Sequence, residues 1–505
     1  MTVSHLDFDG TDWFGSLDSD ISDINLRRVY CNRDLNLASV HWVGFDMDYT
    51  LAIYRRESFD ALTYKLTLQR LVDEFGYPEA ICERPFNPDF AIRGLVIDKR
   101  TGHILKMNLF RHVGKAWHGL RELTDEERSR YRKDIPQISS RRYRLLDTLF
   151  EIPEAYVFAM LVDFYEGSAA PLPQEGQEPA NYEKIAEDVR RAIDGIHMDG
   201  TLKSHITKDI QTYIYRDPDL ASALHRLRSS GKRLFLLTNS DNSYTDALMS
   251  WLLDGRLEAY PSWKTYFDVI ITSAVKPAFF RGNQPFLRLD DHGAVTTDTV
   301  ESFQRGTVYA NGNLRHFEQM IGLGGDEVLY VGDHIFGDIL RSKLDSNWRT
   351  AMIIPEMESE LESTELTRDV TFAWQQAQQG LAVVEREMEL RTDAIRRLRS
   401  LQHGADSDAE RKRIDKLLRP LLRRIDHLRR QSRMLIQRTF EYQQRFDEAF
   451  HSRWGALFKE GNELSLFGSQ VNDFACIYTS RASNLGHFSP MHYFRSHPHR
   501  MPHEL

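Results

Sequence analysis

The stretch VGFDMDYTLA, residues 43–52, decides the expected fold. An apolar run ends there abruptly in Asp46 and Asp48, which are separated by one residue. A short buried strand that stops at acidic residues is typical of an open α/β sheet, which presents functional groups at the carboxyl ends of its strands. Side chains alternate along a strand, so the two carboxylates would share a face if the extended geometry continued. Such a pair can hold a metal ion or divide the roles of nucleophile and acid/base.

The composition of the chain is that of a soluble globular protein. It has 505 residues, of which 41% are hydrophobic and 28% charged, with a net charge of −9. This charge argues against a general nucleic-acid binder, whose domains tend to be strongly basic. Cys31, Cys82 and Cys476 lie far apart and favour neither a disulfide framework nor a zinc site. No apolar run is long enough for a signal peptide or a membrane span, so we expect a cytoplasmic protein without membrane or nucleic-acid partners.

Three later strand ends carry the groups that the first one would need. Thr238, Asn239 and Ser240 follow the apolar run LFLL and offer hydroxyl and backbone N–H groups to a phosphate, although Ser240 or Asp241 could equally cap the next helix. Lys276 follows VIITSAV and could balance the charge of a phosphate, although a lone loop lysine is usually solvated.

The last of these strand ends is VLYVGDHIFGDIL, which contains Asp333 and Asp338. Ligands that are all oxygen suit Mg²⁺, although Asp338 could simply favour the start of a helix. Because strands alternate with helices from residue 231 onward, the pattern predicts an α/β fold with a doubly wound parallel sheet. The polar segment 280–326 interrupts the alternation and is predicted to be an inserted loop or hairpin.

Residues 361–450 are predicted to form an antiparallel helical hairpin. Apolar residues recur at helical spacing on both sides of the turn HGADSD, residues 403–408, and Pro420 should kink or delay the second helix. The second helix is rich in arginine between residues 411 and 433. This charge could bind a polyanion, but interspersed acidic residues favour a solvated face that covers the apolar stripe.

Taken in order, the four strand ends resemble the haloacid-dehalogenase-like phosphohydrolases, which carry D-x-D-x-T, a hydroxyl residue after a strand, a lysine, and G-D-x-x-x-x-D. Within that superfamily, FDMDYTLA, LLTNSD and VGDHIFGDIL closely resemble the cytosolic purine 5′-nucleotidases. The resemblance extends to residues 147–164, 188–203 and 467–485, and covers about two thirds of the chain. It implies a Rossmann-like core with an inserted cap domain and a C-terminal helical extension.

The resemblance implies a role for each matching residue. Asp46 would be the nucleophile and Asp48 the general acid/base. Asp46, the backbone carbonyl of Asp48, and Asp333 would hold Mg²⁺, with support from Asp338. The phosphate would be held by Thr238, Asn239, Ser240 and Lys276, and the nucleoside by Phe150, Arg190, Asp194, His197 and Lys203. From the residues alone, His197 could be a structural histidine and Arg190 a salt-bridge partner of Asp194.

The resemblance also implies a division of the chain. The expected segments are a lead-in with the first core strand (1–52), a mainly cap insertion (53–205), the remainder of the core (206–360), the helical hairpin (361–450) and a C-terminal segment that packs on the core or cap (451–505).

The sequence departs from the family pattern at four positions. Glu151 replaces an asparagine in the Phe150 loop, and Met198 replaces an aromatic residue beside His197. Asp147 and Leu344 replace an amide and a basic residue where vertebrate members bind activating nucleotides, which puts such activation in doubt.

The activity that the resemblance implies is Mg²⁺-dependent hydrolysis of purine nucleoside 5′-monophosphates such as IMP and GMP, through an aspartyl-phosphate. The resemblance also implies phosphotransfer to nucleosides as a second activity, and a homo-oligomeric state.

Two other functions are compatible with the sequence. One is a phosphatase of the same superfamily for a pyrimidine nucleotide or a sugar phosphate. The other is a nucleotide-sensing or scaffold protein without turnover, which would be expected to have lost a catalytic group, whereas all of them are present here.

Overall fold

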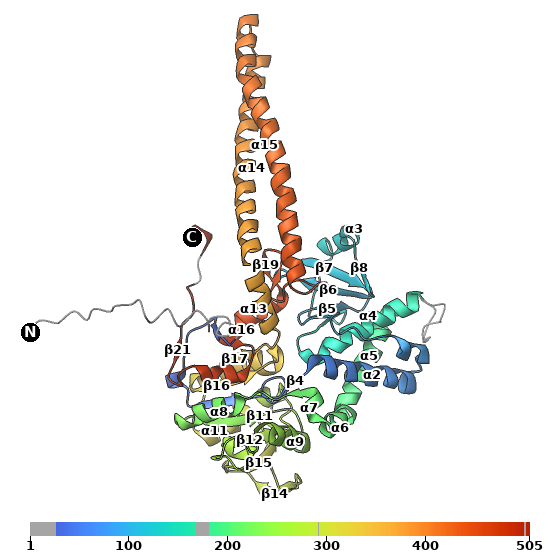
Figure 1. Cartoon of the computed structure of the whole chain (residues 1–505), viewed down its shortest axis with the longest axis vertical. Helices are drawn as coiled ribbons and strands as arrows, with labels where there is room; N and C mark the ends of the chain where they lie inside the picture. The colour runs from blue at the N-terminus through green and yellow to red at the C-terminus, as the bar shows by residue number, and fades with distance from the viewer. Residues whose placement is uncertain (1–26, 168–180, 291, 499–500, 505) are drawn as a thin grey trace, which may run out of the picture. The chain divides into compact units, whose positions relative to one another are not determined.

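The computed structural model describes residues 27–167, 181–290, 292–498 and 501–504, and a ten-stranded sheet forms its core (Figure 1). The order of strands across the sheet is β1-β20-β17-β16-β3-β11-β12-β15-β13-β14. The bounds of these strands are Tyr30–Cys31, Ile477–Thr479, Arg349–Ile353, Val328–Gly332, Trp42–Phe45, Arg233–Leu237, Val269–Thr272, Val308–Asn311, Phe286–Leu289 and Val295–Thr299. The strands from β20 to β15 are parallel and the outer ones antiparallel. The predicted α/β fold with a largely parallel sheet is confirmed.

The central strand β3 depends on a glycine. Gly44 pairs with Phe235 on one neighbouring strand and with Tyr330 on the other. The rings of Phe235 and Tyr330 stack 6.1 Å apart with an angle of 14° between their planes. A Cβ atom on Gly44 would lie only 2.0 Å from the Phe235 ring, so the aromatic side chain fills the space above the glycine.

Helices connect the parallel strands, as the alternating pattern predicts. The described helices of this part of the chain are α8 (Leu220–Ser229), α9 (Asn242–Leu253), α10 (Ala278–Arg281), α11 (Leu314–Ile321), α12 (Arg341–Ser346) and α16 (Leu466–Phe474). A π-helical turn, Ile335–Leu340, directly follows β16. Asp241 caps α9 by accepting a hydrogen bond from the backbone N–H of Tyr244, which decides between the two predicted caps.

The segment 280–326 is more than the inserted loop or hairpin that its polar sequence suggests. It does contain the antiparallel pair β13 and β14, but it also contains β15, which lies parallel to β12 in the main sheet, and then α11. The prediction missed β15 because this strand ends in Asn311 and lies between the turn residues Gly306 and Gly312.

The part of the chain between β3 and β11 forms a second, antiparallel sheet. Its strand order is β8-β7-β6-β5-β9, with bounds Arg121–Glu122, Val113–His118, His103–Met107, Val96–Asp98 and Tyr143–Leu145. A hairpin turn at residues 99–102 joins β5 to β6, and a capping box of Thr124 and Glu127 begins α3 (Asp125–Arg128). The accompanying helices are α2 (Arg56–Phe75), α4 (Ile152–Gly167), α5 (Tyr182–Met198) and α6 (Thr201–Lys208). The Pro/Gly-rich stretch of residues 167–180, whose composition predicts a surface loop, lies almost entirely outside the described residues.

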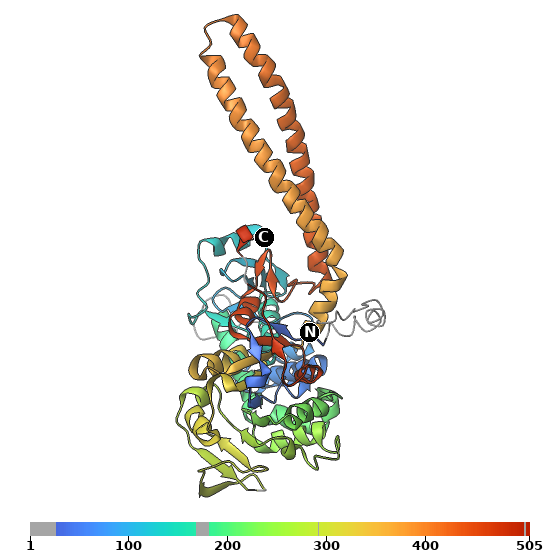
Figure 2. The same cartoon turned by 90° about the vertical axis from the view of Figure 1, so that its left-hand side faces the viewer.

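Residues 359–456 form a separate compact unit. Within it, α14 (Arg368–His403) and α15 (Asp408–Ala449) run side by side in opposite directions, as both views show (Figures 1 and 2). Ile395, Ile414, Leu418 and Ile425 are buried between them. Pro420 does not delay the second helix, because α15 begins twelve residues earlier and continues through the proline. Pro420 has no backbone N–H, so α15 loses one helical hydrogen bond at this position. The packing of α15 against α14 offsets this loss.

Among the described residues, no helix is both long enough and apolar enough to cross a membrane.

Replacement of Gly44 by alanine is expected to lower the free energy of unfolding by about 1–3 kcal/mol, because the new methyl group would overlap the Phe235 ring. Chemical unfolding followed by circular dichroism measures the effect. The control is Gly380→Ala in α14, where the nearest atoms to the added Cβ are the Leu435 methyl carbons at 3.8 Å and helix propensity should rise. Adding Phe235→Leu to Gly44→Ala should recover part of the loss; an unchanged stability of Gly44→Ala would contradict the packing argument.

Candidate active site

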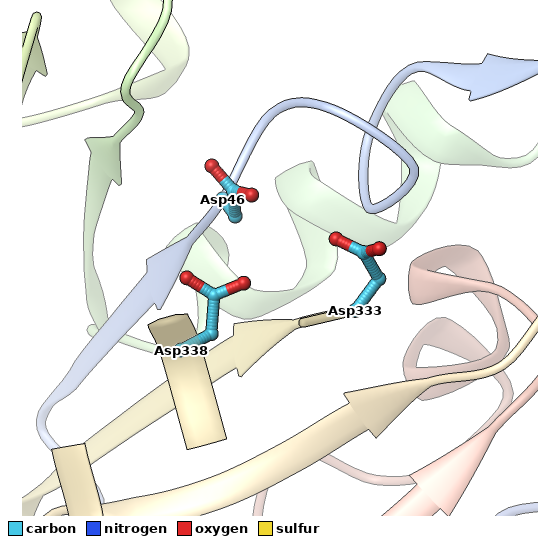
Figure 3. A group of neighbouring side chains, drawn as sticks. All are labelled: Asp46, Asp333 and Asp338. Atoms are coloured by element: carbon cyan, nitrogen blue, oxygen red, sulfur yellow. The ribbon is translucent and has the colours of Figure 1, made fainter. Parts of the chain in front are cut away.

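Three aspartates meet at the carboxyl edge of the main sheet. Asp46 follows β3, while Asp333 and Asp338 lie just beyond the end of β16, and Figure 3 shows the three carboxylates facing a common space. One carboxylate oxygen from each lies within 4.8 Å of the others, and all three residues are buried. The sequence prediction thus names three side chains that the fold does bring together.

Burial makes two of these carboxylates, those of Asp46 and Asp333, hard to ionise. It raises the pKa of Asp46 to about 7; Lys276 opposes this rise, and Asp338 and Asp48 add to it. Burial also raises the pKa of Asp333 well above its usual value, with further contributions from Asp338 and Asp46. Oδ2 of Asp333 is buried and accepts no hydrogen bond from any described residue. A compact set of hard oxygen ligands with one unused oxygen fits a divalent cation such as Mg²⁺.

Lys276 is the positive charge within this cluster. Its Nζ lies 2.6 Å from Oδ1 of Asp338 and 2.8 Å from Oδ1 of Asp46, and it donates to the hydroxyl of Tyr330 at 3.0 Å. Burial alone would lower the pKa of Lys276, but the charges of Asp338 and Asp46 outweigh it and raise the pKa well above its usual value. The lysine is therefore charged and is not the solvated loop residue of the alternative interpretation.

The second aspartate of the D-x-D motif is held apart from the cluster. The hydroxyl of Tyr54 donates to Oδ1 of Asp48 at 2.7 Å, and the hydroxyl of Ser240 donates to Oδ2 at 2.8 Å. Tyr54 also contacts the hydroxyl of Tyr244 at 2.9 Å. Burial raises the pKa of Asp48, and the two hydroxyl donors oppose the rise. Both carboxylate oxygens are thus oriented by neighbours, which suits a group that exchanges protons at one fixed position.

The residues predicted to hold phosphate have more definite contacts than the sequence suggested. Thr238 is buried, and its hydroxyl accepts a hydrogen bond from the backbone N–H of Ser240 at 3.1 Å. The side-chain amide of Asn239 bonds to both backbone groups of Lys276, donating to its carbonyl at 3.0 Å and accepting from its N–H at 2.5 Å. The side chain of Asn239 therefore holds the backbone of Lys276 in place, and the hydroxyl of Ser240 donates a hydrogen bond to Asp48.

Arg93 is a residue that the sequence reasoning missed. It is buried, donates to the backbone carbonyl of Asp333 at 3.1 Å, and forms two hydrogen bonds with the carboxylate of Glu356 at 2.6 and 2.7 Å. Its guanidinium also lies 4.8 Å from the centre of the Phe467 ring. Arg93 thereby ties the backbone of Asp333 to two other parts of the fold. No local motif marks such an arginine in a sequence.

A cluster of aromatic side chains lies beside the D-x-D loop. Phe150 contacts Tyr49, Tyr54, Phe59 and His197, with ring centres between 4.8 and 5.5 Å apart. Nε2 of His197 is buried and has no hydrogen-bond partner among the residues described. Burial, followed by the charges of Arg190 and Lys203, lowers the pKa of His197 to about 4, so its ring is neutral near pH 7. A buried polar nitrogen without a partner is costly, which distinguishes His197 from a satisfied structural histidine.

The other predicted nucleoside-binding residues are engaged in ion pairs. Arg190 contacts Asp194 at 2.9 Å, Glu154 at 3.0 Å and Glu151 at 3.1 Å, so the predicted pairing with Asp194 is present within a larger network. Lys203 contacts Asp241 at 2.6 Å.

Glu151 and Met198, which depart from the family pattern near these residues, differ in burial. Glu151 is buried, where Arg144 also contacts it, and burial raises its pKa. Met198 is 86% exposed.

Comparison with known proteins gives a consistent result. Residues 29–505 match the 5′ nucleotidase family. The 5′-nucleotidase domain-containing protein 2 of Homo sapiens is 32% identical over 373 residues, covering 71% of this chain and 69% of that protein. The Rattus norvegicus protein of the same name is 32% identical over 377 residues, covering 71% and 65%. A 5′-nucleotidase domain-containing protein of Dictyostelium discoideum is 30% identical over 481 residues, covering 92% and 73%.

Two of the solved structures that match the chain both have a TM-score of 0.21. CbbY from Rhodobacter sphaeroides in complex with phosphate is 13% identical and has a TM-score of 0.21, covering 62% of this chain and 86% of that one. A TM-score this low carries no argument about the fold.

Replacement of Lys276 by methionine is expected to destabilise the protein by about 3–5 kcal/mol, because it leaves Asp46 and Asp338 buried without their shared cation. Urea unfolding in the presence of a chelator measures the change, since added metal could neutralise the carboxylates. A second substitution, Asp338→Asn, should restore part of the stability in the Lys276→Met background. Equal stability of Lys276→Met and the wild type would show that the ion pairs do not hold this edge together.

Proposed function

The chain belongs to the 5′ nucleotidase family and is a phosphoric monoester hydrolase, and on this premise we propose that it is a Mg²⁺-dependent 5′-nucleotidase for purine nucleoside 5′-monophosphates of the 6-oxo type, such as IMP and GMP. One observation carries the proposal. The buried Asp46–Lys276 pair lies at a sheet edge beside an aromatic group that contains His197, a neutral histidine with an unused buried nitrogen. The first feature suits phosphoryl transfer and the second suits recognition of a base.

In the proposed mechanism Asp46 attacks the phosphorus atom and forms an aspartyl-phosphate, while the bond to the nucleoside 5′-oxygen breaks. Asp48 protonates that leaving oxygen and then removes a proton from the water that hydrolyses the acyl-phosphate. The hydroxyl donors of Tyr54 and Ser240 keep the Asp48 carboxyl in one orientation for both steps. Lys276 stabilises negative charge that develops on the transferring group.

The side chains of Asp46 and Asp333 and the backbone carbonyl of Asp48 would hold Mg²⁺. Asp338 would support the site indirectly, because its carboxylate already accepts hydrogen bonds from Lys276 and from the backbone N–H of His334. When bound, the cation neutralises charge on the phosphate oxygens. Arg93 keeps the backbone of Asp333 in place through its hydrogen bond to the carbonyl.

For the nucleoside, Phe150 offers an aromatic face next to the D-x-D loop, where a purine could stack. Nε2 of His197 would meet a polar edge of the base or the ribose, and its lack of a present partner supports this role. Arg190, Asp194 and Lys203 would orient the nucleoside, each exchanging part of an existing ion pair for a contact with substrate.

A second activity follows from the covalent intermediate. A nucleoside bound in the place of the leaving product could accept the phosphoryl group from Asp46 through its 5′-hydroxyl, with Asp48 removing the hydroxyl proton. We therefore include phosphotransfer between nucleosides in the proposed function.

Asp46→Asn is expected to lower kcat for IMP by about a thousandfold or more, because an amide cannot act as the nucleophile. Phosphate release from a panel of purine, pyrimidine and sugar monophosphates measures both activity and selectivity. Chelation should abolish wild-type activity, and added Mg²⁺ should restore it. Asp326→Asn, which alters an exposed carboxylate before β16, is the matched control. Wild-type turnover by Asp46→Asn would exclude the mechanism, and equal turnover of sugar phosphates and purine nucleotides would exclude the substrate class.

His197→Ala is expected to raise KM for IMP about tenfold, because the buried nitrogen would no longer meet the nucleoside. Hydrolysis of p-nitrophenyl phosphate, which lacks a purine and a ribose, should be unchanged in the same variant. Met198→Ala alters the exposed neighbour and should leave both substrates unaffected. If His197→Ala impairs both substrates equally, His197 acts on the fold of the site and not on recognition of the nucleoside.

A further inference from the structure

The helix α15 carries a strong excess of positive charge. Its segment 411–438 contains eleven lysine or arginine residues and two aspartates, which gives a net charge of +9. The whole chain has a net charge of −9, so the residues outside this segment together carry −18. Such a separation of charge within one chain is typical of a surface that meets a polyanion.

The two aspartates of this segment do not interrupt its positive surface. Asp415 pairs with Arg419 at 3.2 Å, and Asp426 pairs with Arg429 at 3.3 Å. At about 100° per residue, the two aspartates lie within roughly 20° of one line along α15. The acidic residues that favoured an ordinary solvated face in the sequence are therefore confined to one flank of the helix.

On another side of α15, four cations have no carboxylate beside them. Lys412, Lys416, Arg423 and Arg430 are exposed, and none of them forms an ion pair within the part of the chain that the structure describes. We call these four residues the basic row. Helical geometry places them roughly 120–160° around the axis from Leu418, which is buried in the hairpin. The basic row thus follows one line over roughly 27 Å of helix.

The packing of the hairpin argues against two common partners of a basic amphipathic helix. Insertion into a bilayer and binding in the groove of a helix-binding protein both require that the helix offers its apolar face. In α15 this face is already occupied, because Ile414, Leu418 and Ile425 are buried in one cluster with Ile395 of α14. A partner must therefore bind to the charged side of α15.

The charged side offers mainly ionic contacts. Within roughly 40° of the basic row, the other residues between positions 412 and 430 are Arg419, Pro420, Asp426 and His427. None of them is a tryptophan, tyrosine, phenylalanine or large aliphatic residue, which are the usual anchors of protein interfaces and of stacked single-stranded bases. A row of cations without such anchors fits a partner that is itself a regular row of negative charges.

We propose that the basic row binds the phosphate backbone of a nucleic-acid duplex, independently of base sequence. A duplex carries one negative charge per ~1.7 Å of its length, and lysine and arginine both contact phosphate oxygens. The net charge of the whole chain conceals this surface, because the negative charge outside the segment outweighs it. The structure thus revises the expectation, drawn from net charge, that the protein has no nucleic-acid partner.

Fluorescence anisotropy of a labelled duplex of ~20 base pairs, titrated with the full chain, measures this binding. Because each phosphate contact releases counterions, log Kd should rise with log [NaCl] with a slope of about 3.6 or more, which is about 0.9 for each member of the basic row. Duplexes of different base sequence should give the same Kd within about twofold, because phosphates carry no sequence information. DNA and RNA duplexes should both bind, and a single strand of equal length should bind more weakly.

Simultaneous replacement of the basic row by glutamine (Lys412→Gln, Lys416→Gln, Arg423→Gln and Arg430→Gln) should lower this slope by about 3.6 and raise Kd at least about tenfold at ~50 mM NaCl. Glutamine preserves helix propensity, and phosphatase activity should stay at the wild-type level. The matched control removes four exposed cations outside the helical unit: Lys65→Gln, Arg100→Gln, Lys133→Gln and Arg226→Gln. It has the same net charge as the first variant and should keep the wild-type slope.

Three results would overturn the proposal. The first is a wild type that binds no duplex at ~50 mM NaCl, where the ionic contacts are strongest. The second is an equal loss of binding in the two variants, which would assign the effect to net charge and not to the basic row. The third is displacement of the duplex by polyglutamate, or by vesicles of phosphatidylserine and phosphatidylcholine, at lower charge concentrations than by unlabelled duplex. That result would identify an acidic protein or a membrane as the partner.

Discussion

A buried lysine between two aspartates is the interaction on which the candidate active site depends. Lys276 comes from the loop after β12, Asp46 from the end of β3, and Asp338 from the π-helical turn after β16. Without the ammonium group, carboxylates that come from two strand ends would repel one another in a region from which water is excluded. The same charge would attract a phosphate, so one side chain serves both the packing of the sheet edge and the binding of an anion.

Much of the fold could be predicted because its central strands are short, largely apolar and soon followed by polar residues. The strands β3, β11, β12 and β16 have this form, and the structure places them as neighbours. Among the strands of this sheet that escaped prediction, β15 and β20 gain their place by pairing with β12 and β17. Such pairing is a property of distant segments, which no local pattern records.

The candidate site likewise contains residues that sequence patterns predicted and contacts that they did not. The motif residues were predicted together because residues at the ends of parallel strands must share an edge. What could not be predicted are the supporting contacts: Tyr54 on Asp48, Asn239 on the backbone of Lys276, and Arg93 on the carbonyl of Asp333. Each is a hydrogen-bonding contact between residues that lie 6, 37 or 240 positions apart, and tyrosine, asparagine or arginine at these positions has no distinguishing pattern in sequence.

The position of β20 has a consequence for how the protein is made. This strand lies beside β17 in the sheet, yet the whole helical unit of residues 359–456 separates the two in the chain. A ribosome that adds roughly 5–20 amino acids per second must therefore work for about ten seconds between releasing one strand and its neighbour. During that interval β17, next to the strand that carries Asp333, presents an open edge of unpaired backbone groups in the nascent chain. We expect chaperones that shield exposed strand edges to engage this protein late in its synthesis.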